Sequence, residues 1–215
     1  MSDQATKQNQ ARFDAVAAEW DSNPGRIAQA RAVVEAIRKS VPLQPTMKAL
    51  DFGAGTGLIT LGLLPDVADI TAVDASREML RVLDQKLKAL RIENVHTCLN
   101  ESEPARLPMA GFDFLVSSMV LHHIPNVPQT LRQLRPCLRP GGWIALADLV
   151  TEDGTFHADA TGVYHLGLDP ADVCGWLREV GFGNITAREA HRIERSSADG
   201  KTREYPVFLV IGQAT

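Results

Sequence analysis

The chain has 215 residues, of which 45% are hydrophobic and 22% charged, and its formal net charge is -4. This length fits one domain better than two, and the acidic balance provides no basic face for a nucleic-acid backbone. No apolar run reaches the roughly 18–20 residues of a membrane span, and the polar start lacks the apolar stretch of a signal peptide. We therefore expect a single cytoplasmic domain over residues 1–215, with no nucleic-acid or membrane partner. The cysteines Cys98, Cys137 and Cys174 are far apart and are expected to be reduced packing residues.

The N-terminal part is predicted to precede the sheet. Residues 1–10 are polar and are expected to be disordered, whereas residues 11–46 are expected to form a helical cap. Within this cap, apolar residues recur at helical spacing from Arg26 to Lys39. The proline-containing segment 41–46 then ends the helix.

Short apolar runs alternate with helical stretches along the rest of the chain. Strands are predicted at residues 48–52, 70–73, 95–99, 112–117, 143–149, 184–190 and 205–211. Helices are predicted at residues 58–64, 77–90 and 128–138, and after the cap and first-turn proline Asp169-Pro170. Strands that alternate with helices pair in parallel because parallel neighbours need a crossover, whereas the last two strands have no helix between them. The pattern predicts an α/β fold: a Rossmann-like, doubly wound, seven-stranded and mostly parallel sheet with a C-terminal antiparallel hairpin.

Three glycines follow the first predicted strand directly, and a helix follows them. Gly53, Gly55 and Gly57 suit a backbone that turns sharply or approaches a ligand closely, at the βα turn where doubly wound sheets bind adenosine-containing cofactors. The dinucleotide pattern GxGxxG would need a glycine where Leu58 stands, and the phosphate-binding pattern GxxxxGK[ST] would need a lysine. An ordinary tight turn remains the alternative.

An acid ends the second predicted strand. Asp74 can accept hydrogen bonds from both ribose hydroxyls of an adenosine. The alternative is a helix cap, but Ser76 already supplies a good one.

These segments together resemble the class I S-adenosylmethionine (SAM)-dependent methyltransferases. The resemblance runs from about Lys48 to the C-terminus. It is carried by residues 50–57 (LDFGAGTG), 73–76 (VDAS), 112–124 (FDFLVSSMVLHHI) and 138–143 (LRPGGW). Phe13-Asp14 and Trp20-Asp21 also resemble the family's leading helix, which often folds over the cofactor.

The resemblance implies SAM as the cofactor and assigns most of its contacts. Gly53, Ala54, Gly55 and Gly57 would lie beside the methionine part, and Asp51 would orient the loop or bind the amino group through water. Asp74 would hold the ribose, with Ala75 and Met79 beside the adenine. Asn100 stands where the family often has an aspartate that binds the adenine amino group, and an Asn carbonyl can still accept there. The remaining cofactor-binding candidates are Glu101, next to Asn100, and Ser117, in the fourth strand.

The chemistry of SAM demands little of the protein beyond alignment, since the sulfonium methyl is already activated. His122 and His123, after the fourth strand, are the candidate catalytic bases. Structural hydrogen bonding at the start of a helix is the alternative for both.

The candidate substrate contacts are Trp20 and, in the long loop 151–168, Tyr164 and His165, with packing an equal alternative for the loop pair. No metal is predicted. His122, His123, His165 and Asp148 could converge, but they lack ligand spacing.

The function predicted on this basis is methyl transfer from SAM to a small-molecule acceptor by in-line displacement. The Asn/Asp-Pro-Pro-Tyr-type motif of amino-group DNA methyltransferases is absent after the fourth strand. A non-catalytic SAM- or SAH-binding module is the alternative, where SAH is S-adenosylhomocysteine. A nucleotide-dependent oxidoreductase is disfavoured by the missing third glycine. The acceptor, its reacting atom and the oligomeric state are left open.

Overall fold

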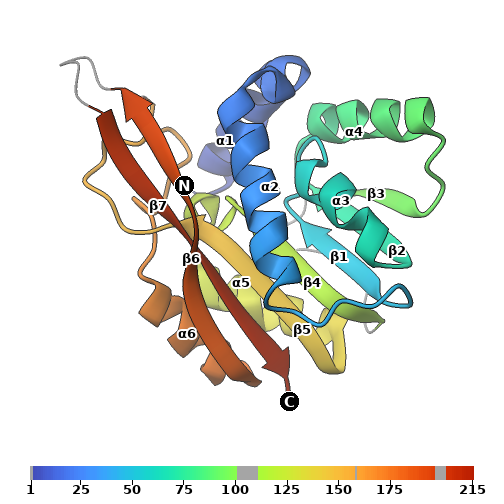
Figure 1. The fold of residues 1–215 in the computed structure, drawn as a ribbon. Helices are drawn as coiled ribbons and strands as arrows, with labels where there is room; N and C mark the ends of the chain where they lie inside the picture. The colour runs from blue at the N-terminus through green and yellow to red at the C-terminus, as the bar shows by residue number, and fades with distance from the viewer. Residues whose placement is uncertain (1, 101–110, 158, 197–201) are drawn as a thin grey trace.

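The structure is a computed structural model that describes residues 2–100, 111–157, 159–196 and 202–215 (Figure 1). Its strands are β1 (Lys48–Phe52), β2 (Asp69–Asp74), β3 (Val95–Leu99), β4 (Phe112–Ser118), β5 (Leu138–Leu149), β6 (Phe182–Ser196) and β7 (Thr202–Ala214). Its α-helices are α1 (Ser2–Val16), α2 (Pro24–Arg38), α3 (Leu58–Leu63), α4 (Arg77–Leu90), α5 (Val127–Leu134) and α6 (Pro170–Glu179). Short 3-10 helices are η1 (Ala17–Ser22), η2 (Leu64–Asp66), η3 (Leu121–His123) and η4 (Arg135–Cys137).

The seven strands form one sheet in the order β3-β2-β1-β4-β5-β7-β6. The first five strands pair in parallel, and β7 pairs antiparallel with both β5 and β6. The predicted doubly wound sheet and its C-terminal antiparallel hairpin are confirmed. The chain progresses outward in one direction from β1 and in the other from β4. The carboxyl ends of these two neighbours therefore flank the crevice where open α/β sheets bind ligands.

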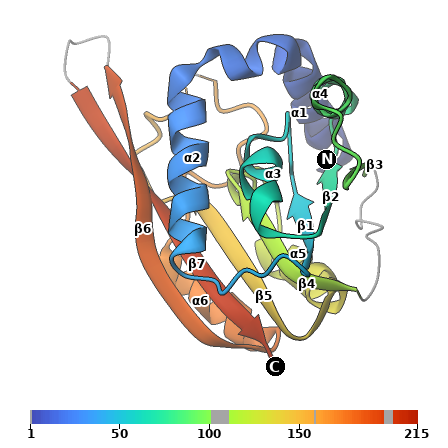
Figure 2. The same ribbon diagram turned by 45° about the vertical axis from the view of Figure 1, so that its right-hand side comes forward.

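Helices cover both faces of the sheet (Figures 1 and 2). One face packs against α2, α3 and α4, with Ile37, Leu63 and Leu83 fully buried. The other face packs against α5 and α6, with Leu131 and Leu177 fully buried. Each helix presents an apolar stripe at helical spacing to the sheet, and burying one such side chain stabilises the fold by about 1.5–3 kcal/mol.

Helix α1 includes residues from the segment 1–10, for which the sequence predicts disorder. The structure places all but the first of these residues in this helix, which is anchored through side chains farther along it. The carboxylate of Asp14 accepts a hydrogen bond from the Ser76 hydroxyl at 2.5 Å. Arg12 donates to main-chain carbonyls within residues 159–161. The polar composition that suggested disorder gives no sign of these long-range contacts.

Other boundaries differ from the prediction at proline and in the hairpin. The helix expected over residues 128–138 ends at Leu134 and continues as η4, because Pro136 lacks the N–H that an α-helix needs. Strand β6 extends to Ser196, and β7 begins at Thr202. The polar residues near these two ends therefore pair with each other in the sheet instead of forming a long loop. Among the described residues, no helix combines the length and apolar character needed to cross a membrane.

Candidate functional site

A cavity of about 1180 Å³ lies at the carboxyl edge of the sheet. Residues that follow β1, β2, β3 and β4 form its floor, and α1, α2, the loop after β5 and the end of β6 close it from other sides. Its floor includes the topological switch point between β1 and β4. The cavity therefore occupies the position where this fold class binds its ligands.

The three glycines after β1 have different structural roles. Each has a left-handed φ, of +80°, +55° and +84° for Gly53, Gly55 and Gly57. A Cβ on Gly53 would overlap Val120, and a Cβ on Gly57 would overlap Leu83. A Cβ on Gly55 would meet no atom within 4 Å. Gly55 therefore faces ligand space, whereas Gly57, which is absent from the lining, serves turn geometry and packing.

Asp74 connects the glycine loop to the start of α4. One carboxylate oxygen accepts from the Gly55 N–H at 2.7 Å, and the other accepts from the Ser76 N–H at 2.8 Å. Burial raises the pKa of Asp74 above its ordinary value, although these hydrogen bonds oppose that rise. Each oxygen keeps a further lone pair, and Asp74 lines the cavity, so the side chain can accept from a bound hydroxyl.

Most predicted cofactor-binding residues surround this carboxylate. Those that line the cavity are Gly53, Ala54, Gly55, Asp74, Ala75, Met79 and Asn100. The Asn100 N–H donates to the Asp74 carbonyl at 2.8 Å, so β3 delivers Asn100 beside the end of β2. Glu101 lies outside the described residues.

Asp51 and Ser117 support the cavity from below and do not line it. Asp51 is 1% exposed and accepts from the Thr60 hydroxyl at 2.6 Å, which ties β1 to α3. Burial raises the pKa of Asp51 to about 7. Ser117 donates to the Phe52 carbonyl at 2.8 Å and so joins β4 to β1. Neither side chain lines the cavity, and the assignment of both residues to cofactor binding stays a prediction.

His122 forms a buried pair with Asp148. Its Nδ1 lies 2.6 Å from a carboxylate oxygen of Asp148, with the side chains 2% and 0% exposed. Because a carboxylate accepts, Nδ1 carries a proton, and Nε2 is the ring nitrogen left available to a ligand. Burial raises the pKa of Asp148, but the His122 charge and the hydrogen bonds that Asp148 accepts outweigh it and hold that pKa below its ordinary value. His122 lines the cavity with its Nδ1 side held fixed.

His123 and His157 extend this pair into a cluster of rings. The His123 ring centre lies 4.0 Å from that of His122, and the His157 ring centre lies 5.2 Å from it. His123 Nδ1 donates to the Gly162 carbonyl at 2.8 Å. Burial lowers the pKa of His123 to about 3 and that of His157 to about 4, so both are neutral near pH 7. The Phe13 ring, from α1, packs edge-on against the His123 ring with the ring centres 5.2 Å apart, and so joins the cluster.

One of the three predicted substrate contacts lines the cavity, and the other two lie behind its lining. Trp20 lines the cavity. Tyr164 and His165 do not: both main-chain N–H groups donate to the His122 carbonyl, at 2.9 and 3.2 Å. His165 Nε2 also donates to the Ile124 carbonyl at 2.9 Å. The two loop residues therefore brace the turn that carries His122.

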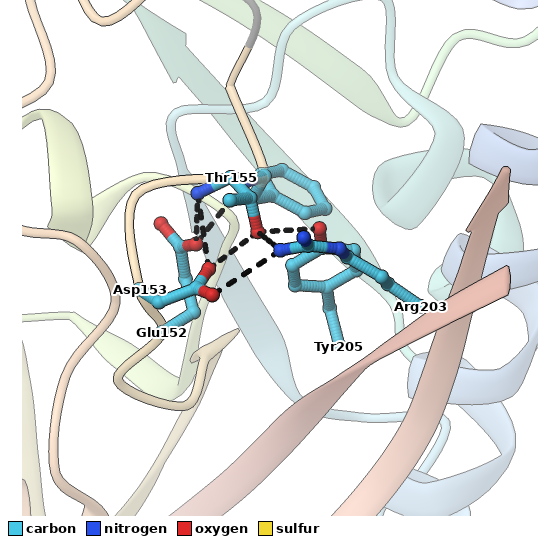
Figure 3. A network of polar contacts seen from close by, with 6 residues as sticks. Glu152, Asp153, Thr155, Arg203 and Tyr205 are labelled. Atoms are coloured by element: carbon cyan, nitrogen blue, oxygen red, sulfur yellow. Dashed lines mark hydrogen bonds and ion pairs between the residues drawn. The ribbon is translucent and has the colours of Figure 1, made fainter. Parts of the chain in front are cut away.

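A polar network holds the loop after β5 against β7 (Figure 3). The Thr155 hydroxyl lies 2.8 Å from the Tyr205 hydroxyl and accepts from Arg203 at 2.9 Å. Arg203 also donates to Asp153 at 3.2 Å. The Glu152 carboxylate accepts the Thr155 N–H at 2.8 Å and the next main-chain N–H at 3.0 Å. This network positions the segment that brings Phe156 and His157 to the cavity.

Several cavity residues were not predicted from the sequence. Arg26 and Arg195 come from α2 and β6, more than a hundred residues apart, and no local motif marks them. Met119 has a φ of +60° at the end of β4, a strained conformation for a non-glycine residue. The sequence predicted a functional turn after the fourth strand, but it did not indicate that Met119 in this turn has a strained backbone. Over the described residues, no group of three or more His, Cys, Asp or Glu side chains is arranged to hold a metal ion.

Comparisons with known proteins agree with this geometry. A sequence model for a methyltransferase domain matches residues 50–144. An uncharacterized methyltransferase of Schizosaccharomyces pombe is 30% identical over 156 residues, covering 64% of this chain and 54% of that protein. The 27-O-demethylrifamycin SV methyltransferase of Amycolatopsis mediterranei is 28% identical over 190 residues, covering 83% and 70%. The matches to the first curated relatives span 44–59% of those proteins.

Solved structures show the same fold. The methyltransferase bound to the Trm112 activator in a Haloferax volcanii complex superposes with a TM-score of 0.75 at 16% identity, covering 94% of this chain and 97% of that one. The sheet order, the glycine loop and the matching domain point to one family. The chain contains a methyltransferase domain and has the fold of the class I SAM-dependent methyltransferases.

Proposed function

We propose that this protein binds SAM in the cavity at the carboxyl edge of the sheet and transfers its methyl group to a small-molecule acceptor. One observation carries the proposal. Asp74 accepts from Gly55 and Ser76 and still has acceptor capacity, beside a glycine whose missing side chain leaves room for a ligand.

Residues along the cavity would contact successive parts of SAM. Gly53 to Gly55 would lie beside the amino-acid part, and Asp74 would accept from the ribose hydroxyls. Met79 and Asn100 would flank the adenine. When bound, SAM supplies a methyl group on a sulfonium, which a nucleophile displaces in line. The chain's own contribution is to hold the acceptor in line and exclude water, and such alignment is worth up to about 7–11 kcal/mol.

His122 is the residue we assign to proton acceptance. Its Nδ1–H is bonded to Asp148, so Nε2 can take a proton from a hydroxyl or similar nucleophile while Asp148 stabilises the resulting imidazolium. His123 is less suited to this role, because a pKa of about 3 makes it a weak base. As a neutral ring with Nδ1–H engaged, it can accept a hydrogen bond and orient the acceptor.

The size of the cavity favours an enzyme over a sensor module. Its volume of about 1180 Å³ exceeds the ~300–1,000 Å³ of pockets that hold one drug-sized ligand, so a second reactant can enter beside the cofactor. Phe13 and Trp20 from the N-terminal helices close over the cavity, which suits a small acceptor. The similarity to a methyltransferase that acts on 27-O-demethylrifamycin SV supports the same class of acceptor. A non-catalytic SAM-binding module remains the second candidate.

Two measurements test the proposal. Calorimetry should show SAH binding to the protein and its loss in Gly55→Val, whose side chain would fill ligand space and force a β-branched residue into a left-handed φ. The melting temperature of the variant reports whether it folds. Incubation of the protein with methyl-labelled SAM and a metabolite extract should transfer label to a small molecule. Absence of SAH binding would refute the cofactor assignment, and binding without transfer would favour the sensor module.

A further inference from the structure

Three arginines line the same cavity from three separate elements. Arg12 comes from α1, Arg26 from α2 and Arg195 from β6. Arg195 stands beside Phe156, so it lies at the part of the cavity that contains the histidine rings. None of the three is needed for the cofactor contacts assigned to the glycine loop and Asp74.

The guanidinium groups of Arg26 and Arg195 are held flat against aromatic rings. The Arg26 guanidinium carbon lies 3.7 Å from the centre of the Trp20 ring, and one nitrogen donates to the Trp20 carbonyl at 3.1 Å. The Arg195 carbon lies 3.8 Å from the centre of the Phe156 ring, and Arg195 donates to the Phe156 carbonyl. Each guanidinium has five N–H donors, so each retains donors for a ligand. Stacking also pre-orients the planar group and reduces the entropy lost on binding.

These three arginines line the cavity without a carboxylate partner among the described residues, whereas six arginines elsewhere form ion pairs. Ion pairs with Asp or Glu are formed by Arg38, Arg81, Arg132, Arg139, Arg192 and Arg203. Neither Arg26 nor Arg195 has a carboxylate within ion-pair distance across the described part of the chain. Among the residues that the structure describes, Arg12 donates to main-chain carbonyls.

The acids nearest to them are engaged elsewhere. Asp21 pairs with Lys86 and accepts from Thr56. One Glu152 oxygen accepts from main-chain N–H groups of its own loop, and the other is buried without a hydrogen-bond partner among the described residues, so Glu152 forms no ion pair with Arg195. Glu194 lines the cavity as well, but its side chain projects to the opposite face of β6 from Arg195.

The positive charges are held close together despite their repulsion. Burial lowers the pKa of Arg26, and the charge of Arg195 lowers it further, against a smaller rise from Asp21. After burial, the charges of His122, Arg12 and Arg195 also lower the pKa of His157. His157 Nε2 is buried and has no hydrogen-bond partner among the described residues. Guanidinium groups that line one cavity without a carboxylate partner call for a ligand that supplies acceptor oxygens.

We propose that the methyl acceptor is an anion, with a carboxylate or phosphate group that Arg26 and Arg195 bind while its apolar body packs against Trp20 and Phe156. This inference rests on the proposed methyltransferase function. Arg26 and Arg195 are then the residues that determine acceptor specificity.

Binding of charge-matched probes to the SAH-saturated protein tests the inference directly. Benzoate and benzamide have similar size and shape but differ in charge, and phenyl phosphate separates phosphate from carboxylate recognition. Calorimetry should show that benzoate or phenyl phosphate binds at least about tenfold more tightly than benzamide, since hydrogen bonds to a charged group contribute about 1.5–3 kcal/mol. Anions that bind no better than benzamide, including the case in which none of the three binds, would overturn the inference.

Matched arginine variants assign the effect to the cavity. Arg195→Gln and Arg26→Gln should each reduce the preference for the anion by about tenfold. Arg192→Gln removes the same charge from the opposite face of β6, where Arg192 pairs with Glu189 and Glu204, and should leave the preference unchanged. An equal effect of all three variants would show non-specific electrostatics and reject the site.

The outcome is separable from that of the proposed function. SAH affinity is measured in the same titrations, and Arg195→Gln should leave it within about twofold of the unmodified protein. If the unmodified protein does not bind SAH, the methyltransferase assignment is refuted. Normal SAH binding without anion preference would refute only the acceptor class.

Discussion

Asp74 combines a structural and a binding role in one carboxylate. Its two oxygens accept the Gly55 and Ser76 N–H groups and also face the cavity. Asp74→Ala should therefore weaken SAH binding at least tenfold and lower the free energy of unfolding by about 1–3 kcal/mol, because two main-chain donors lose their acceptor. Calorimetry and urea unfolding measure the two effects separately. An unchanged SAH affinity would contradict the assignment of Asp74 to the ribose.

His122 should affect turnover more than binding. His122→Gln removes the proton acceptor of the buried pair, and we expect the rate of methyl transfer to fall by about 10²–10⁴-fold if the nucleophile must lose a proton. SAH affinity should change little. His96→Gln is a matched control, because His96 pairs with Asp69 on the exposed side of β3 and should have full activity. Equal activities of the two variants would remove His122 from catalysis.

Asp51 should make stability depend on pH. The folded protein holds the Asp51 proton more tightly than the unfolded chain, since burial raises its pKa from 3.8 to about 7. Its contribution to the free energy of unfolding therefore falls as pH rises through this window. Asp51→Asn removes the titration, so the stability of the variant relative to the unmodified protein should rise by ~1–3 kcal/mol between pH 5 and pH 8. Urea unfolding at both pH values tests this, and a constant difference would contradict it.

The sequence predicted individual residues well where a local motif carried the signal. Gly55 and Asp74 stand at the ends of buried strands, and the turn pattern that places them is contiguous. Arg26 and Arg195 could not be found in this way, because only the tertiary fold brings α2 to β6. For Tyr164 the sequence left substrate contact and packing equally open for a related reason: a residue's position in a long loop does not reveal whether its hydrogen bonds point inward or outward.

Among the elements, helix α1 is the one attached most directly to the proposed cofactor site. Asp14 accepts from the Ser76 hydroxyl and from the Glu78 N–H, both at the start of α4. Asp14→Ala should loosen this attachment and weaken SAH binding by about 3–10-fold, with faster hydrogen exchange confined to α1. Glu35→Ala, on the outer surface of α2, should change neither quantity. Unchanged exchange in α1 would show that Asp14 does not hold the helix in place.

Strands were predicted more accurately than the N-terminal helix for a physical reason. β1, β3 and α4 have the predicted bounds because a buried strand or an amphipathic helix is specified by its own apolar pattern. Helix α1 is polar, and its position depends on contacts with α4 and with the loop after β5. The sequence did not predict the ends of β6 and β7 at the hairpin turn, because the paired residues there are polar on both strands.

At the scale of the whole molecule, the order of the strands determines where chemistry can occur. The switch between β1 and β4 gathers the glycine loop, Asp74 and the His122 turn at one edge, and the N-terminal helices close that edge. The fold class and this edge could be predicted from the alternation of elements. The shape of the cavity could not, because residues from both ends of the chain line it.

A crystal structure of the protein with SAH tests the central claim most directly. We predict that the homocysteine part lies beside Gly53–Gly55 and that both ribose hydroxyls donate to Asp74. The sulfur should face the side of the cavity formed by His122 and His123. SAH bound away from the glycine loop, or with its ribose out of reach of Asp74, would contradict the account.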